Sequence, residues 1–404
     1  MRKIVTVLLI SVIALSSVFA IDFNTDEIYA QIRNPYKNLD VRSLGMGGVG
    51  NAATNNIQAL WSNPAGLADK KVQVSLPSIG VSVYNVQALS KVAEETMNSN
   101  SETSESDMFS NIFKVLGTGY GKIFDVNAGL SFTAGGFGLG IAVQDSLYTY
   151  APKTSTGGLS SNIIDQLTAE VRAGYGHKFR FTEKFSMDIG ASVGFRYMLF
   201  NEAVDANKIL DITNQMQDGG DASVALSKIP LIGGWTVPIN AGVRFNLPFG
   251  FKLATSISDL NFGNNMTLFD NYEGLKDAPF GGSGYEKYKL KSDFSWDAGF
   301  AWDPDWSWGF KPTLEVDFVD IWGFIEDKDF SGRSWMNHLN IGAELKGLWI
   351  FDIRGGLDRG YWTVGAGFNL YVIRVEAAYY WHEFGSVAGE KGIDGLTVQI
   401  NIGW

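Results

Sequence analysis

Four arginines stand on the polar side of stretches in which apolar and polar residues alternate. They are Arg172, Arg196, Arg354 and Arg374. A guanidinium group can bind a carboxylate through two parallel hydrogen bonds, so each arginine could hold the carboxylate of a ligand. Acidic residues occupy the same polar side, and pairing with them is the more usual role: Glu170, Asp188, Asp352 and Glu376. The sequence leaves both roles open.

Other reactive residue types do not assemble into a site. The three histidines, His177, His338 and His382, lie in separate strand-like segments, and the chain has no cysteine. A metal or catalytic site needs companion ligands or bases, and no local motif supplies them. We therefore expect no enzyme, no bound metal and no cofactor.

A glycine pattern near the N-terminus matches a nucleotide-binding motif. Gly45, Gly47 and Gly50 fit the spacing G-x-G-x-x-G. That motif works within a strand–helix–strand unit, and no such unit surrounds it here. We expect these glycines, together with Gly48, to let backbone approach backbone closely in a compact plug.

The first twenty residues have the three parts of a secretory signal. Arg2 and Lys3 precede an apolar run from Ile4 to Leu15, and small residues lead to Ala20. The run is shorter than the roughly 20 apolar residues of a spanning helix, and no cysteine follows for lipid attachment. We expect residues 1–20 to be a signal peptide and the mature chain to begin near residue 21.

Composition narrows the class of the exported chain. The formal net charge of −11 disfavours nucleic acid as a partner, because phosphate binding needs a basic face. The chain has 12 Trp, 15 Tyr, 27 Phe and 47 Gly but only 10 Pro. Aromatic girdles, and small residues where strands curve, are typical of a transmembrane β-barrel.

Alternation with a period of two predicts strands along the chain after residue 71. In Leu396–Trp404, for example, every second residue is apolar. The predicted strands are 72–87, 119–134, 137–150, 164–181, 185–200, 235–248, 250–262, 286–303, 308–322, 335–347, 349–358, 361–370, 372–384 and 394–404. We therefore predict an all-β fold, a transmembrane antiparallel barrel of about 14 strands over residues 72–404.

The connections between these strands alternate between short turns and long loops. The three longest loops are 88–118, 201–234 and 263–285. Short turns face the periplasm and long loops face outward in bacterial outer-membrane barrels, so we expect that orientation here, with a periplasmic C-terminus. Met108–Leu116 carries an apolar stripe at helical spacing, which could receive a hydrophobic ligand or pack the loop onto the barrel mouth.

Residues 21–71 lack the period-two pattern and contain two distinctive runs, VRSLGMGGVG at 41–50 and ALWSNPAGLA at 59–68. Here the sequence resembles the FadL/TodX family of outer-membrane transporters for hydrophobic compounds, with its PorV-like relatives. In that family such a segment forms a hatch inside a fourteen-stranded barrel. The likeness is strongest over Arg42–Ala68, and Asn63, Pro64 and Ala65 correspond to the family's Asn-Pro-Ala hatch motif.

The resemblance implies passive uptake of hydrophobic compounds such as long-chain fatty acids. A ligand would land among the external loops, enter an apolar pocket above the hatch, and leave sideways into outer-membrane lipid through a kink in the third strand. The hatch would be residues 21–71, with a periplasmic position, and the four arginines would be candidates for a fatty-acid carboxylate.

The third predicted strand, 137–150, contains Asp145 where strict alternation turns the side chain toward lipid. Near the membrane midplane this would cost roughly 2–4 kcal/mol. A bulge at Gln144–Ser146 would relieve the cost and would open the wall where the family has its exit. Alternatively, Asp145 lies at the outer interface, where the cost fades.

The first predicted strand has an irregularity of its own. The alternation switches face between Leu76 and Ile79, around Pro77. A switch of face beside a proline indicates a second bulge.

Two other functions stay open. A PorV-like protein that shuttles or docks secreted proteins would share the hatch and would have a protein partner. A general porin would need an open lumen, and the hatch argues against it.

Overall fold

The computed structural model describes most of the chain after residue 39. The described residues are 40–54, 56–98, 121–150, 162–201, 204–205, 231–290, 292–304, 306, 309–348, 350–384, 388–389 and 391–403. The expected signal peptide (1–20) and the Met108–Leu116 stripe lie outside them.

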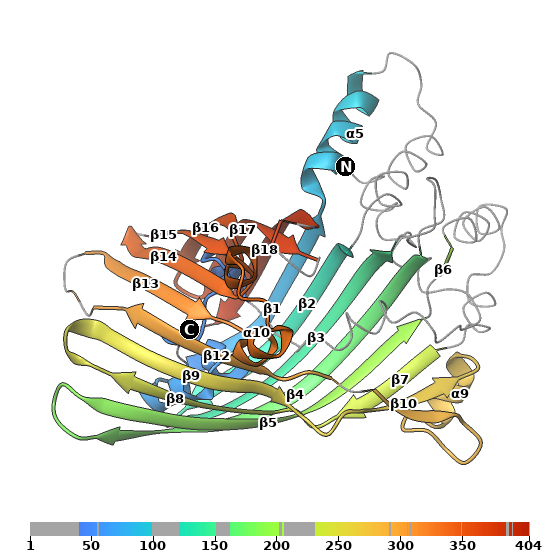
Figure 1. Cartoon of the computed structure of the whole chain (residues 1–404), viewed down its shortest axis with the longest axis horizontal. Helices are drawn as coiled ribbons and strands as arrows, with labels where there is room; N and C mark the ends of the chain where they lie inside the picture. Colours follow the sequence, from blue (N-terminus) through green and yellow to red (C-terminus); the bar gives the residue numbers. More distant parts are fainter. Residues whose placement is uncertain are drawn as a thin grey trace.

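One antiparallel sheet closes on itself, because β1 pairs with both β18 and β2 (Figure 1). Its strands are β1 (Gln73–Tyr84), β2 (Gly121–Ala134), β3 (Phe137–Tyr150), β4 (Asn162–Arg180), β5 (Ser186–Asn201), β6 (Val204–Asp205), β7 (Leu231–Thr236), β8 (Ile239–Asn246), β9 (Phe251–Leu260), β10 (Asn264–Phe269), β11 (Lys287–Leu290), β12 (Ser295–Trp302), β13 (Lys311–Phe318), β14 (Leu339–Leu348), β15 (Phe351–Asp358), β16 (Tyr361–Leu370), β17 (Ile373–Glu383) and β18 (Gly392–Gly403). Over the described residues, β5 continues into β6, β7 into β8, β9 into β10 and β11 into β12, which gives a closed barrel of fourteen strands. The predicted fold class is confirmed.

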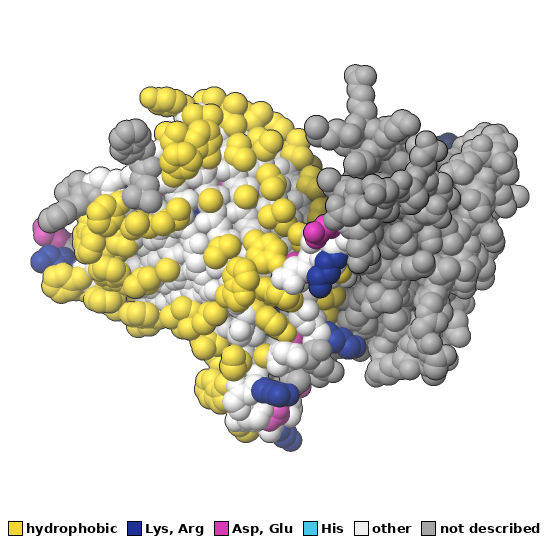
Figure 2. Space-filling view, turned by 90° about the horizontal axis from the view of Figure 1, so that it is seen from above, with side chains coloured by type: hydrophobic (Ala, Val, Ile, Leu, Met, Phe, Trp, Pro, Cys, Tyr) yellow, Lys and Arg dark blue, Asp and Glu magenta, His cyan; other side chains and the backbone are white. Residues whose placement is uncertain are grey.

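The two faces of the barrel wall differ as a membrane barrel requires. Outward side chains such as Leu139 and Val193 are apolar and exposed, at 54% and 49%. Inward positions carry buried charged residues, among them Glu170, Arg172 and Arg244. A soluble sandwich would bury its apolar face instead. An apolar exterior around a polar lumen fits a barrel surrounded by lipid, and Figure 2 shows hydrophobic side chains spread over the wall.

Short turns and long connections alternate around the barrel. Short turns join β2 to β3, β4 to β5, β8 to β9 and β16 to β17 at one end. Helices lie in the lumen or in the connections: α3 (Val41–Gly45), α4 (Asn56–Trp61), η1 (Pro64–Asp69), α5 (Val86–Asn98), η2 (Pro248–Gly250), α9 (Tyr272–Asp277), α10 (Ile321–Asp327) and α11 (Gly332–Asn337). No helix among the described residues has both the length and the apolarity to cross a membrane.

Two predicted loops are shorter than expected. Residues 231–234, placed in the loop 201–234, begin β7, and residues 264–269, placed in the loop 263–285, form β10. The reason is that β10 has no clean alternation. Met266 on its inner face and Phe269 on its other face are both apolar and both buried, so a period-two pattern does not appear.

The bulge expected at Gln144–Ser146 is wrong. Asp145 pairs in unbroken register with Val126 on β2 and with Leu167 on β4. Asp145 is half-buried and lies five residues before the end of β3, away from the middle of the strand. No bulge is therefore needed to turn its carboxylate away from the middle of the membrane. The bulge expected around Pro77 is confirmed, since the pairing of β1 with both neighbours shifts between Ser75 and Ser78.

Candidate functional site

Residues 40–69 form a lumenal segment that crosses the inside of the barrel. Helix α3 packs against β15 to β18, α4 against β1 to β4, and η1 against β4, β5 and β8. Most of its side chains are buried, including Met46, Leu60 and Ala65 at no more than 1% exposure. The segment therefore touches the wall on opposite sides of the lumen.

Arg42 fixes the start of this segment to the wall. Its Nε lies 3.0 Å from Glu344 Oε1, and its Nη2 lies 2.6 Å from Glu344 Oε2. Burial acts to lower the pKa of Arg42, but the carboxylate of Glu344 outweighs it and raises that pKa above its ordinary value. Glu344 also pairs with Arg354 at 2.7 Å, so the segment joins a charge network of the wall.

Two carboxylates of β13 bind the backbone of the segment. Glu315 Oε1 accepts hydrogen bonds from the N–H groups of residues 51–53, at 3.0, 2.6 and 3.0 Å. Asp317 Oδ2 accepts from Gly50 at 2.8 Å. Charge-assisted hydrogen bonds of this kind are the stronger ones in proteins. In the sequence, the only signal of these two residues is that both occupy the polar side of β13, so neither was expected to bind the segment.

The Asn63-Pro64-Ala65 turn begins η1, and Asn63 is 1% exposed. Asn63 Oδ1 accepts from the N–H of Ala65 at 3.0 Å, the bond to its own backbone two residues on that asparagine side chains make in turns. Its Nδ2 donates to Asn51 O at 3.0 Å and to Asn51 Oδ1 at 2.9 Å. One side chain thus ties η1 to the loop that Glu315 holds.

A third attachment lies at the end of η1. Arg244 Nη2 lies 3.0 Å from Asp69 Oδ1 and 2.8 Å from Asp188 Oδ2, and Arg244 Nη1 donates to Thr54 O at 2.7 Å. Lys178 Nζ lies 3.1 Å from the same Asp69 oxygen. Burial acts to raise the pKa of Asp69, but Arg244 and Lys178 outweigh it and hold that pKa below 3.8.

The glycines of the segment lie where backbone meets backbone. A Cβ on Gly45 would stand 2.9 Å from the Cα of Gly365. Gly47 has a φ of +68°, and a Cβ there would meet the carbonyl oxygens of Ile341 and Leu357. Gly48 also has positive φ, at +74°. Close approach to the wall, rather than nucleotide binding, accounts for these glycines.

The four candidate arginines have wall carboxylates as partners. Arg172 and Arg196 both pair with Glu170, at 2.6 and 2.8 Å, and both are 2% exposed. Arg354 is buried between wall acids, whereas the Arg374 side chain is 32% exposed. Arg374 is therefore the candidate that solvent or a ligand can reach.

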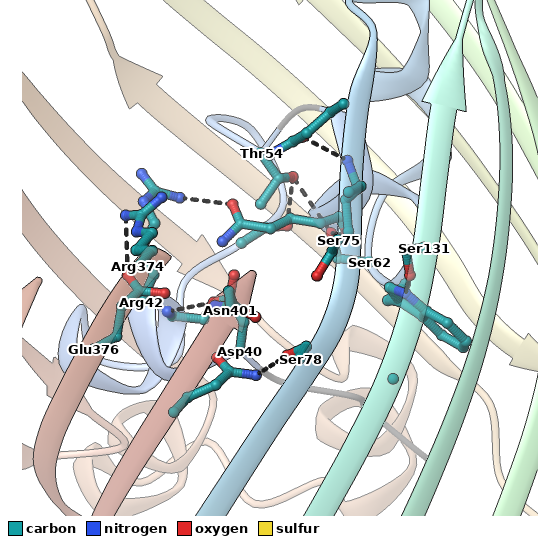
Figure 3. Close-up of a pocket in the computed structure, with 18 of the residues that line it drawn as sticks. Asp40, Arg42, Thr54, Ser62, Ser75, Ser78, Ser131, Arg374, Glu376 and Asn401 are labelled. Carbon is teal, nitrogen blue, oxygen red and sulfur yellow. Dashed lines mark hydrogen bonds and ion pairs between the residues drawn. The ribbon is translucent and has the colours of Figure 1, made fainter. Parts of the chain in front are cut away.

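A cavity of about 380 Å³ lies between the lumenal segment and the wall. Figure 3 shows Ser75 and Ser78 of β1 on its border, with Arg374 across from them. The lining extends to Val319 toward the long loops and to Tyr371 at a short turn. The cavity thus runs alongside the segment and is lined by many hydroxyl groups.

The lumen wall between this level and the long loops carries an apolar cluster, here called the lumenal patch. It consists of Ile164, Met198, Phe200, Ile232, Met266 and Leu290, with Tyr148 and Leu268 packed against it. Met198 lies on the same face of β5 as the lumenal Arg196, and Ile232 pairs with Phe200, so these side chains point inward. An apolar patch inside an otherwise polar lumen is the feature that a hydrophobic ligand requires.

Comparisons with known proteins give one kind of match. No family model matches this chain, and no curated protein matches it. Among solved structures it is similar to the CymD monoaromatic hydrocarbon channel, with 13% identity and a TM-score of 0.47 over 91% of this chain and 98% of that chain. The Pseudomonas putida toluene transporter TodX gives 12% and 0.45 over 92% and 98%. A Pseudomonas aeruginosa FadL homologue gives 12% and 0.44 over 92% and 99%. These neighbours are of the FadL and TodX kind that the sequence resembles. At such identities and TM-scores, they do not identify a ligand for this chain.

Proposed function

We propose that this chain is an outer-membrane channel for the passive uptake of hydrophobic compounds, long-chain fatty acids among them. The observation that carries the proposal is the lumenal patch. Buried charged side chains line much of the lumen, as expected for a barrel interior, while the patch offers a hydrophobic molecule an apolar surface nearer the long loops. Met198 and Met266 within it have flexible side chains that adapt to different ligand shapes.

In this proposal the chain has a hatch of residues 21–71, of which the lumenal segment is described, and this hatch separates the patch from the periplasm. Three sets of polar contacts hold it, at Arg42, at residues 50–53 and at Asp69. The short turns and the C-terminus face the periplasm, and the long loops face outward. A ligand that reaches the patch leaves sideways into outer-membrane lipid, because the hatch blocks the axial route.

A fatty-acid carboxylate would need a cation that is accessible from the lumen. Arg172, Arg196 and Arg354 are buried in ion pairs, so displacing their partners would strand buried charges. Arg374 also pairs with wall carboxylates, Asp352 and Glu376, at 3.4 and 2.9 Å, but it lines the cavity and its side chain is 32% exposed, so a ligand carboxylate can approach it from the lumen. We therefore assign the carboxylate role to Arg374 among the four candidates.

Isothermal titration of the purified barrel with oleate, an alkane and toluene tests the proposal. Met198→Gln places an amide in the lumenal patch at nearly constant volume and should weaken binding about tenfold, or 1.4 kcal/mol. Met187→Gln on the outward side of the same strand is the matched control and should bind as the wild type does. If the wild type binds none of these ligands and retains a secreted protein instead, the PorV-like function replaces this one.

A further inference from the structure

Strand β1 contains one residue more than its neighbours over the same stretch. Ser75 and Ser78 face Ser131 and Gly129 on β2, which is three steps along β1 against two along β2. The same two serines face residues 403 and 401 of β18, again three steps against two. Both ladders of this strand are therefore interrupted at one height.

The extra residue falls at Leu76–Pro77. Pro77 has no N–H to donate, and the two residues have no partner in either ladder. Before the bulge the odd-numbered Ser75 faces the lumen, and after it the even-numbered Ser78 does. The wall is thus a weak seam at this place. Strand β3, by contrast, pairs in unbroken register with β4, and its ladder with β2 shifts only between Lys122 and Phe124, near the long loops.

The cavity reaches the wall at the same place. Its lining includes the lumen-facing cross-strand pair Ser75 and Ser131 next to the bulge, and also residues that face the membrane, Ala128 and Ile141. Ile141 is 44% exposed on the outer face. Figure 3 shows β1 passing between the serines of the lumenal side and Ser131 on β2. One cavity is therefore bordered by residues of both faces.

The wall is thin and uncharged where the cavity meets it. Gly129 has no side chain, and Ala128 contributes only a methyl group to the outer face. Charged lining residues lie elsewhere around the cavity, at Arg42, Arg374 and Glu376 among others. A hydrophobic molecule can pass an uncharged seam without desolvating an ion, so this side suits it best.

Trp61 of the lumenal segment stands at the inner side of this seam. Its Nε1 donates to Ser131 Oγ at 3.4 Å, its side chain lines the cavity, and its ring lies 5.5 Å from the Arg172 guanidinium. A hydrogen bond of that length is weak, and the indole ring presents apolar surface to the cavity. The hatch is thus in contact with the seam.

The geometry points to a lateral portal in β1, at the Leu76–Pro77 bulge between β18 and β2, through which a hydrophobic molecule passes from the lumen into the membrane. The portal deepens the proposed function and rests on it. It places the exit on the first strand and leaves the third strand, with Gln144, Asp145 and Ser146, as closed wall.

Deletion of Pro77 tests the portal directly. Without it β1 alternates regularly, with Ser75 and Ser78 inward and Leu76 and Ile79 outward, and both ladders can close. Uptake of radiolabelled oleate by cells that depend on this protein should fall about tenfold, because the bulge that opens the wall is gone. Pro77→Ala keeps the extra residue and should transport within about twofold of the wild type.

Chemical blocking gives a second test that needs no change in strand length. The chain has no cysteine, so Ala128→Cys can be labelled alone with a bulky, membrane-soluble maleimide. The label should reduce oleate uptake about tenfold, whereas labelled Val193→Cys, outward on β5, which contributes no residue to the cavity lining, should transport normally. Labelled Asp145→Cys should also transport normally if the third strand stays closed.

The outcomes separate the portal from the function on which it rests. Wild-type protein that neither binds nor transports oleate, an alkane or toluene ends the proposed function. Normal uptake by the folded Pro77 deletion, or by labelled Ala128→Cys, overturns the portal while leaving the function in place. A block at labelled Asp145→Cys alone moves the exit to the third strand.

Discussion

Arg42 of the lumenal segment and Glu344 of β14 form a buried ion pair, in which Arg42 Nη2 lies 2.6 Å from Glu344 Oε2. The two residues are 302 positions apart in the sequence. Glu344 also contacts Arg354 and Lys346, at 2.7 and 3.1 Å. The contact therefore joins the N-terminal segment to a charge network formed by the far end of the chain.

Arg42→Ala should loosen the segment and leave the barrel intact. Glu344 keeps its two wall cations, so we expect the segment's opening free energy to fall by only about 1–3 kcal/mol. Hydrogen exchange of the amides of residues 41–54 should accelerate, while the strand amides stay protected. Arg359→Ala, whose partner Asp358 lies 4.0 Å away at the surface, should change neither. Unaltered exchange in Arg42→Ala would show that the ion pair does not hold the segment.

Asn63→Ala removes the side chain that ties η1 to Asn51. The buried donor and acceptor groups it leaves without a partner should cost about 1–3 kcal/mol and raise the conductance of the barrel in planar bilayers. Asn240→Ala is the matched control, because Asn240 is equally buried but bonds to Asp259 of the wall. Equal conductance in the two variants would argue against a special role of the Asn63 turn.

The Asp69 attachment should release in acid. The pKa of Asp69 in the folded chain lies below 3.8, so its carboxylate stabilises the seated segment at higher pH and loses that contribution as pH falls through the lowered pKa. Wild-type conductance should therefore rise only below about pH 4. Asp69→Asn should conduct more already at neutral pH and respond less to acid, whereas Asp69→Glu should follow the wild type. Identical pH profiles for wild type and Asp69→Asn would exclude this attachment.

The barrel could be predicted because lipid and lumen impose opposite chemistry on successive residues. In β18, Leu396, Val398 and Ile400 are 39–47% exposed on the outer face, while Thr397 and Gln399 between them are buried in the lumen. A local pattern carries this information. The β1 bulge could also be predicted, because its two signals, Pro77 and the switch of face, both lie within four residues of sequence.

The attachments of the lumenal segment could not be predicted, because they join residues far apart in the chain. Glu315 and Asp317 bind backbone groups 262 to 267 positions away, and no local pattern encodes such a pairing. The expected bulge in β3 failed for a different reason. Alternation shows which face Asp145 takes but not its depth along the strand, and the depth decides whether a charge must be relieved.

The last prediction separates the segment from the wall. Deleting Asp22–Lys71, with residues 1–20 kept for export, should leave a barrel that still folds, because the closed strand ladder satisfies its own backbone groups without the segment. The wall carboxylates that lose their partners, such as Glu315 and Asp317, would then face a lumen filled with water, where an unpaired charge costs little.

Planar-bilayer conductance should increase in the order wild type, Asn63→Ala, deletion, since each step removes more of the obstruction. Oleate binding to the deletion should persist, because the lumenal patch belongs to β4, β5, β7, β10 and β11 and shares no residue with the segment. A deletion that stays folded, as judged by its strand circular dichroism, yet conducts no better than the wild type would show that residues 22–71 are not a plug. Loss of oleate binding together with a rise in conductance would instead place the ligand on the segment itself.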